Sequence, residues 1–222
     1  MRTVRKFLFL LVSVMVGLGS MPVSANDLDA KFLIKRKGKV IGFHHVNVDE
    51  TDEGYKVDTS IEMKVKFGPI PLFKYTHTAT EEWVGEEIVL LSTRTNNNGK
   101  KLRLDAERSS EGLMIEGTDY TGYAPEGALP SSYWNKNLVS SDQMINTQTG
   151  EIIDLTTEFL GKTKSPAGEM ADHFRLTGTV ALNIWYDGEQ WVGSNFEIDG
   201  EVLDYEFVEA ETHYGELEAF LN

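Results

Sequence analysis

A histidine and a glutamate share one face of an alternating stretch at residues 72–84. His77 and Glu81 both occupy odd positions, which puts them roughly 13 Å apart along an extended strand. The other odd positions are mostly aromatic, and this predicts that their face is buried: Phe73, Tyr75, Ala79 and Trp83. An inward carboxylate is costly unless it is paired or hydrated. Two interpretations follow: His77 and Glu81 line a wet ligand cavity, or they belong to a buried polar network that fixes strand register.

Other patterns that could support catalysis or metal binding are weak. His44 and His45 are adjacent, so they point to opposite faces of a strand and need a bulge to share a metal ion. Pairing of their strand with the next one would bring one of them towards His77. The sequence has no HExxH motif, Gly-x-Ser-x-Gly elbow, phosphate loop or dinucleotide fingerprint. We therefore expect no catalytic residue, metal or cofactor, and an enzyme that uses His77 and Glu81 is the least favoured hypothesis.

A second candidate pair, Tyr133 and Trp134, lies in a long connection at residues 119–150 that breaks the strand rhythm. A short helix is expected within residues 131–140, capped by Ser131 or Ser132. The aromatic pair either closes one mouth of the sheet over an apolar ligand or forms a plug that completes a small core. The predicted ligand-binding residues are therefore His77, Glu81, Tyr75, Trp83, Tyr133 and Trp134.

These side chains need a large sheet to position them, and Tyr55 to Phe67 supplies the clearest strand. Apolar and polar residues alternate through it without a break, and at about 3.3 Å per residue it would be roughly 43 Å long. Its partner strand would place one set of side chains inside: Val57, Ile61, Val65, Phe73, Tyr75 and Trp83. A second set would face solvent: Lys56, Glu62 and Lys64.

Turn signals divide the rest of the chain into about eleven strands and at most two short helices. No βαβ rhythm appears, so the sheet should be antiparallel. We predict an all-β fold, a large antiparallel meander curled into a half-open or closed barrel and covered by a short helix or aromatic loop. A two-sheet sandwich is the second choice.

The N-terminus has the features of a secretory signal peptide, predicted to span residues 1–25. Arg2, Arg5 and Lys6 precede the apolar run 7–18, which is too short to cross a bilayer, and small residues follow at a cleavage site after Ala25. We expect one β-domain at residues 26–222, with residues 209–222 as an acidic tail, in the periplasm of a Gram-negative-type bacterium or secreted. No membrane span is expected after the signal is removed.

The composition excludes several classes of protein. The chain has no cysteine, so a lipid-anchored lipoprotein, a disulfide and thiol chemistry are ruled out. Its net charge is −14, and removal of the basic signal segment makes the charge more negative. Such a surface repels nucleic acid and anionic lipid, so neither is expected as a partner.

Four pieces of the sequence together resemble a family of secreted bacterial proteins of unknown function: residues 38–42, residues 75–83, Ser132-Tyr133-Trp134-Asn135 and Trp185-Tyr186-Asp187. In architecture alone, the curled sheet is also similar to periplasmic carriers of lipoproteins and to lipocalin-like binders. The leading hypothesis is a non-catalytic protein that binds an apolar or amphipathic small molecule inside the sheet. The main alternative is an adaptor that contacts another envelope protein through an open sheet edge.

Overall fold

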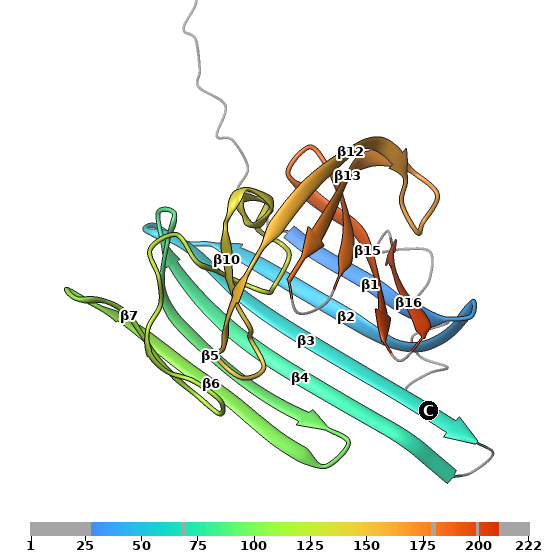
Figure 1. Ribbon diagram of the computed structural model, residues 1–222, viewed down its shortest axis with the longest axis horizontal. Coiled ribbons are helices and arrows are strands. Elements are labelled where there is room, and N and C mark those ends of the chain that lie inside the picture. The colour runs from blue at the N-terminus through green and yellow to red at the C-terminus, as the bar shows by residue number, and fades with distance from the viewer. Residues whose placement is uncertain (1–27, 68–69, 179–180, 199, 209–222) are drawn as a thin grey trace, which may run out of the picture.

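The computed structural model describes residues 28–67, 70–178, 181–198 and 200–208. A single antiparallel sheet of thirteen strands dominates it, in the order β12-β13-β14-β15-β16-β1-β2-β3-β4-β5-β6-β7-β8 (Figure 1). The strands are β1 (Leu28–Arg36), β2 (Lys39–Glu50), β3 (Gly54–Phe67), β4 (Ile70–Val84), β5 (Glu87–Asn97), β6 (Lys100–Ser109), β7 (Gly112–Gly117), β8 (Thr121–Tyr123), β12 (Thr156–Lys164), β13 (Met170–Thr177), β14 (Leu182–Asp187), β15 (Gln190–Ile198) and β16 (Glu201–Val208).

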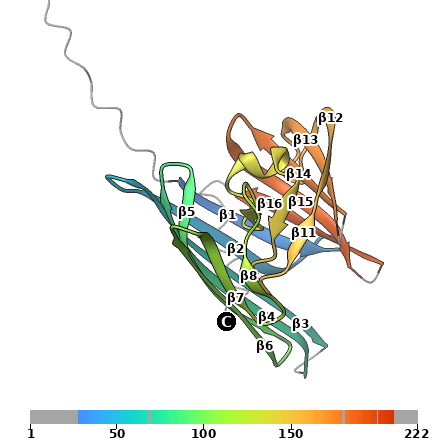
Figure 2. The ribbon, with the colours of Figure 1, turned by 60° about the vertical axis from the view of Figure 1, so that its left-hand side comes forward.

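A second, small sheet forms inside the connection between β8 and β12. It has three strands in the order β11-β10-β9: β9 (Leu129–Pro130), β10 (Gln143–Ile145) and β11 (Ile152–Asp154). The 3₁₀-helix η1 (Lys136–Ser140) lies between β9 and β10. In both ribbon views this connection lies between the arm β1–β8 and the arm β12–β16 (Figures 1 and 2).

Close backbone contacts fix the connection to the inner face of the first arm. The Thr93 hydroxyl of β5 donates to the Thr147 carbonyl at 2.6 Å, and the Asp119 amide donates to the Thr149 carbonyl at 3.1 Å. A Cβ atom on Gly117 would lie 2.1 Å from the Thr149 carbonyl oxygen, so only glycine permits this approach. The connection therefore fills the concave side of the sheet.

The predicted register of β3 and β4 is confirmed. Val57 is fully buried, and Tyr75 and Trp83 are in the core with Ile61 and Phe73 packed against it. Val65 is half-buried on the same face. The opposite face carries the exposed Lys56 and an ion pair of 2.8 Å between the half-buried Glu62 and Lys64. Alternation alone was sufficient to orient these two long strands.

The all-β class and the curled antiparallel sheet are confirmed, and the sheet is not closed because β8 and β12 are its two edges. The predicted count of about eleven strands is too low. Residues 169–186 alternate in the sequence in the way that a single strand would, but they form two antiparallel strands, β13 and β14. The expected helix is shorter than residues 131–140, and Asn135, not Ser131 or Ser132, caps it.

Three predictions fall on parts of the chain outside the description. The signal peptide at residues 1–25, its cleavage site and the acidic tail at 209–222 lie beyond the described residues. Within the described ranges, there is no helix with the length and apolar character needed to traverse a bilayer.

Candidate functional site

Glu81 is fully buried on the inner face of β4. Its Oε2 accepts hydrogen bonds from the indole Nε1 of Trp83 at 2.9 Å and of Trp134 at 3.0 Å. Its Oε1 has no hydrogen-bond partner among the described residues. Burial raises the pKa of the Glu81 carboxyl, and the hydrogen bonds from Trp134 and Trp83 offset part of that rise. The carboxyl therefore ties the connection to β4 through two indoles.

His77 and His44 occupy the same cross-strand row of the inner face, because His44 pairs with Ile61 and Ile61 pairs with His77. Of the two adjacent histidines, His44 is the one on the same face as His77, whereas His45 points outward and bonds to Asp29. This row places two imidazoles on one face with an isoleucine between them.

The two inner histidines differ in their polar contacts. His77 Nδ1 lies 2.8 Å from the Thr95 hydroxyl, whereas neither ring nitrogen of His44 has a partner in the described part of the chain. The His44 ring lies 5.1 Å from Trp191 and 5.8 Å from Tyr205, centroid to centroid. Burial lowers the pKa of His44 to about 3 and that of His77 to about 4. Both imidazoles are therefore neutral in the folded protein at neutral pH.

Tyr133 lies in the connection and packs against buried residues of β14 and β15. Its backbone has a φ of 66°, in the left-handed region that is uncommon for a bulky residue. The ring packs 5.6 Å from Trp191, and the carbonyl accepts a 2.7 Å hydrogen bond from the Tyr186 hydroxyl. Burial raises the pKa of Tyr133 to about 12, and Tyr133 in turn contributes to the raised pKa of Tyr75. A strained aromatic residue held in this way marks a constrained position.

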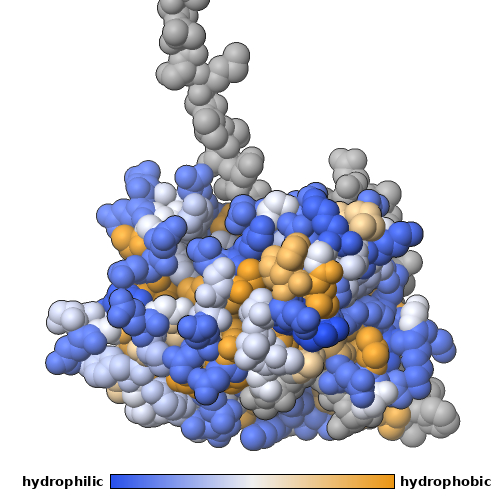
Figure 3. Space-filling model, turned by 45° about the horizontal axis from the view of Figure 1, so that its top comes forward, coloured by the Kyte–Doolittle hydropathy of each residue, from blue (hydrophilic) through white to orange (hydrophobic). Residues whose placement is uncertain are grey.

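A partly open hollow of about 340 Å³, called the interior hollow, lies between the small sheet and β13–β15. Most of its lining is apolar, and a few polar groups enter it: Met144, Ile152, Ile153, Leu155, Leu176, Gly178, Leu182 and Phe196, with Ser131, Tyr133, Asn146, Gln148 and Glu151. Figure 3 shows apolar residues reaching the surface in the middle of one face, surrounded by hydrophilic ones. This mixed lining suits a molecule with a large apolar part and a small polar one.

A second hollow, of about 440 Å³, lies at one end of the sheet and is called the rim hollow here. Trp83 and Trp134 line it together with Tyr55 at the start of β3. The two indole rings meet edge to face at 5.5 Å, and Tyr55 contacts Trp134 at 6.1 Å.

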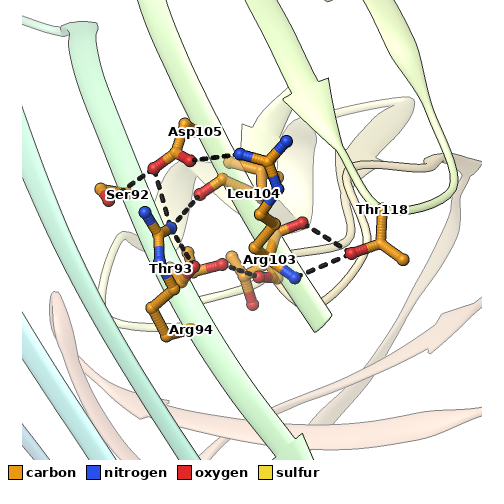
Figure 4. A network of polar contacts seen from close by, with 8 residues as sticks. Ser92, Thr93, Arg94, Arg103, Leu104, Asp105 and Thr118 are labelled. Carbon is orange, nitrogen blue, oxygen red and sulfur yellow. Dashed lines mark hydrogen bonds and ion pairs between the residues drawn. The ribbon is translucent and has the colours of Figure 1, made fainter. Parts of the chain in front are cut away.

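The outer face of β5 and β6 carries a polar network (Figure 4). Asp105 accepts hydrogen bonds from Arg94 and Ser92 at 2.8 Å each, and an ion pair of 3.4 Å joins it to Arg103. Burial alone would raise the pKa of Asp105, but the hydrogen bonds from Arg94 and Ser92 and the charges of both arginines lower it. Because the guanidinium groups are mostly exposed, this network contributes little to stability.

The family model for a domain of unknown function, DUF6134, matches residues 32–208 of the sequence. The chain belongs to this family. The resemblance to a family of unknown function is thereby confirmed, and the DUF6134 match begins in β1 and ends with β16. The sequence matches no curated protein at a significant level.

A solved structure shares the fold of this DUF6134 domain. It is the crystal structure of a β-barrel-like protein of a domain of unknown function, DUF1849, from Brucella abortus. The two align with a TM-score of 0.57 and 8% identity, over 82% of this chain and 95% of that chain. At this identity the likeness concerns the fold alone.

The DUF6134 fold gives the six predicted ligand-binding residues three different surroundings. Glu81, Trp83 and Trp134 share one hydrogen-bonded group, and both indoles also line the rim hollow. His77 is buried against Thr95. Tyr75 and Tyr133 lie in the core region, where Tyr133 also lines the interior hollow. Ligand binding by these residues stays a prediction.

Sequence reasoning missed most of the residues that line the two hollows. Met144 and Gln148 lie in the connection, and Phe196 lies in β15, so only the packing of distant segments brings them together. One sequence signal could have found two of them: the even-numbered residues between 174 and 186 are mostly apolar, and they include Leu176 and Leu182 of the interior hollow.

Proposed function

We propose that this protein binds an apolar or amphipathic small molecule in the interior hollow and acts without catalysis. The observation that carries the proposal is the hollow itself, about 340 Å³ in volume and lined mainly by apolar side chains. Small-molecule sites commonly have volumes of about 300–1,000 Å³ and a few polar groups that orient the ligand. Tyr133, Ser131 and Gln148 are such groups here.

The proposed setting is the periplasm or the extracellular medium. The basic and apolar N-terminal segment with its small-residue site supports this location. A soluble carrier of an apolar compound is useful there, because such a compound does not dissolve freely in an aqueous compartment.

Native mass spectrometry of protein purified from its own host tests the proposal. We expect a small molecule to remain bound to the wild type. Met144→Trp should remove it, because the indole fills the hollow that Met144 lines. Met170→Trp is the matched control, since Met170 is an exposed residue at the start of β13. A wild type without any bound small molecule, or equal retention by both variants, would contradict the proposal.

An adaptor that contacts another envelope protein is the second candidate. One observation favours it: β12 is a terminal strand, and its Phe159 is 59% exposed beside Phe174. However, a bulge at Phe159–Gly161 and the exposed Lys162 protect this edge against unspecific strand pairing. In the same experiment, a stoichiometric protein in place of a small molecule would favour the adaptor.

A further inference from the structure

One wall of the rim hollow is formed by three aromatic rings, those of Tyr55, Trp83 and Trp134. Tyr55 pairs with Trp83 across β3 and β4, and Trp134 packs against both rings. The tyrosine is 40% exposed, so part of its ring faces solvent. This wall occupies one end of the sheet, where β3 begins and β4 ends.

Hydrogen bonds to the buried Glu81 fix the orientation of the two indoles. Both Nε1 atoms donate to Glu81 Oε2, at 2.9 and 3.0 Å, so the polar edges of Trp83 and Trp134 point into the protein. The surface that the indoles offer to the hollow is therefore carbon. A rigid apolar wall of this kind loses little conformational entropy when a ligand packs against it.

Residues with neutral amide side chains line the same hollow. They include Asn137 and Gln190, whose side chains make no hydrogen bond to another described residue. Asn135 uses its Oδ1 to accept from the Asn137 backbone amide at 2.9 Å, which leaves its NH₂ group available. Each amide side chain can both donate and accept, as a ligand that carries hydroxyl groups requires.

The charges that line the rim hollow are mixed. Glu86 and Glu189 are exposed acids. Lys136 donates to the Gly188 carbonyl at 2.6 Å and lies 3.5 Å from Glu189. Lys136 and Glu189 largely cancel each other's charge, and the remaining Glu86 is exposed and screened by solvent, so the lining does not require a charged ligand. A neutral, hydroxyl-rich ligand fits this lining best.

We propose that the rim hollow is a carbohydrate-binding site. The apolar C–H face of a sugar ring packs on Tyr55 and Trp134, while its hydroxyl groups bond to the amides of Asn137 and Gln190. The volume of about 440 Å³ has room for a short segment of a neutral oligosaccharide. The site shares no lining residue with the interior hollow, so its test is independent of the test of the function proposed above.

Titration with soluble oligosaccharides tests the site, with tryptophan fluorescence and calorimetry as the measurements. The probes are cellotetraose, maltotetraose and the N-acetylglucosamine tetramer. We expect at least one probe to change the fluorescence and to bind with a Kd of about 1 mM or tighter. Tyr55→Ala and Asn137→Ala should each weaken that binding by about tenfold. Both residues are exposed, so neither variant should disturb the fold.

Tyr123→Ala is the matched control, because Tyr123 is 44% exposed on the terminal strand β8 and outside the rim hollow. It should bind the probe as the wild type does. The proposal is overturned if no probe binds at about 10 mM. It is also overturned if Tyr123→Ala weakens binding as much as Tyr55→Ala does, or if tetramethylammonium binds where the sugars do not.

Discussion

The side chain of Glu81 links strand β4 to the connection. Its carboxyl accepts from Trp83 of β4 and from Trp134 of the connection, so a single side chain joins segments 53 positions apart. The carboxyl is fully buried, which raises its pKa, and its Oε1 has no hydrogen-bond partner among the described residues. This geometry favours the buried network over the wet cavity as the immediate surroundings of Glu81.

Two substitutions at Glu81 separate these interpretations. Glu81→Leu leaves two buried indole N–H groups without an acceptor, at about 1–3 kcal/mol each. We expect the melting temperature to fall by about 5–10 °C in thermal unfolding followed by circular dichroism. Glu81→Gln keeps an acceptor for both indoles and should melt within about 2 °C of the wild type. A Glu81→Leu protein that melts like the wild type would show that the carboxyl is hydrated.

His44 and His77 should make the free energy of unfolding depend on pH. In the unfolded chain both imidazoles gain protons below about pH 6.5, whereas in the folded protein their pKa values are about 3 and about 4. The unfolded state therefore binds more protons as the pH falls from about 6.5 towards 4, and stability is lost over that range. At pH 5 each histidine accounts for about 2 kcal/mol of that loss.

His44→Phe tests this dependence with little change in shape, because the ring already lies among Phe32, Trp191 and Tyr205. We expect urea unfolding to show equal or higher stability at about pH 7, since two unpartnered nitrogens are removed. The loss between pH 7 and pH 5 should shrink by about 2 kcal/mol. His45→Phe on the outer face is the control. An unchanged loss in His44→Phe would mean that His44 is hydrated or charged in the fold.

At the scale of elements, alternation predicted the long strands well and the connection poorly. In β3 and β4 each side chain meets either water or core, so residue type encodes its face and the register follows. The alternation of residues 169–186 continues across the turn between β13 and β14. This happens because the paired residues of the two strands are either both even-numbered or both odd-numbered. Periodicity alone therefore missed the boundary between these two strands.

The candidate site was predictable only where a local pattern marks its residues, either polar groups on an aromatic strand face or the aromatic pair Tyr133 and Trp134 in the long connection. His77 and Glu81 stood out because polar groups on an aromatic face are costly. The inward position of His44 needed the pairing of β2 with β3. Asn137 and Gln190 come from η1 and β15, and no local pattern indicates that they meet beside Trp134.

At the scale of the whole molecule, the two arms of an open sheet lie on either side of the connection that joins them. The sheet edges β8 and β12 do not pair, and the segment between them fills the concave side. Glu81, Thr93 and Gly117 hold that segment from three different strands, β4, β5 and β7. The interior hollow lies beside this fixed segment, so its shape depends on whether the connection opens.

Hydrogen exchange measured by mass spectrometry tests whether the connection is a fixed plug. Local opening is least favourable where backbone amides are paired and buried, so β2–β4 at the centre of the sheet should exchange slowest. The terminal strands β8 and β12 should exchange fastest. Amides at residues 145–151 should be protected more than those of β12, because their backbone bonds and the Thr93 contact hold them against the sheet. Exchange of residues 145–151 at the rate of β12 would instead show a connection that opens, and ligand entry to the interior hollow would then proceed through it.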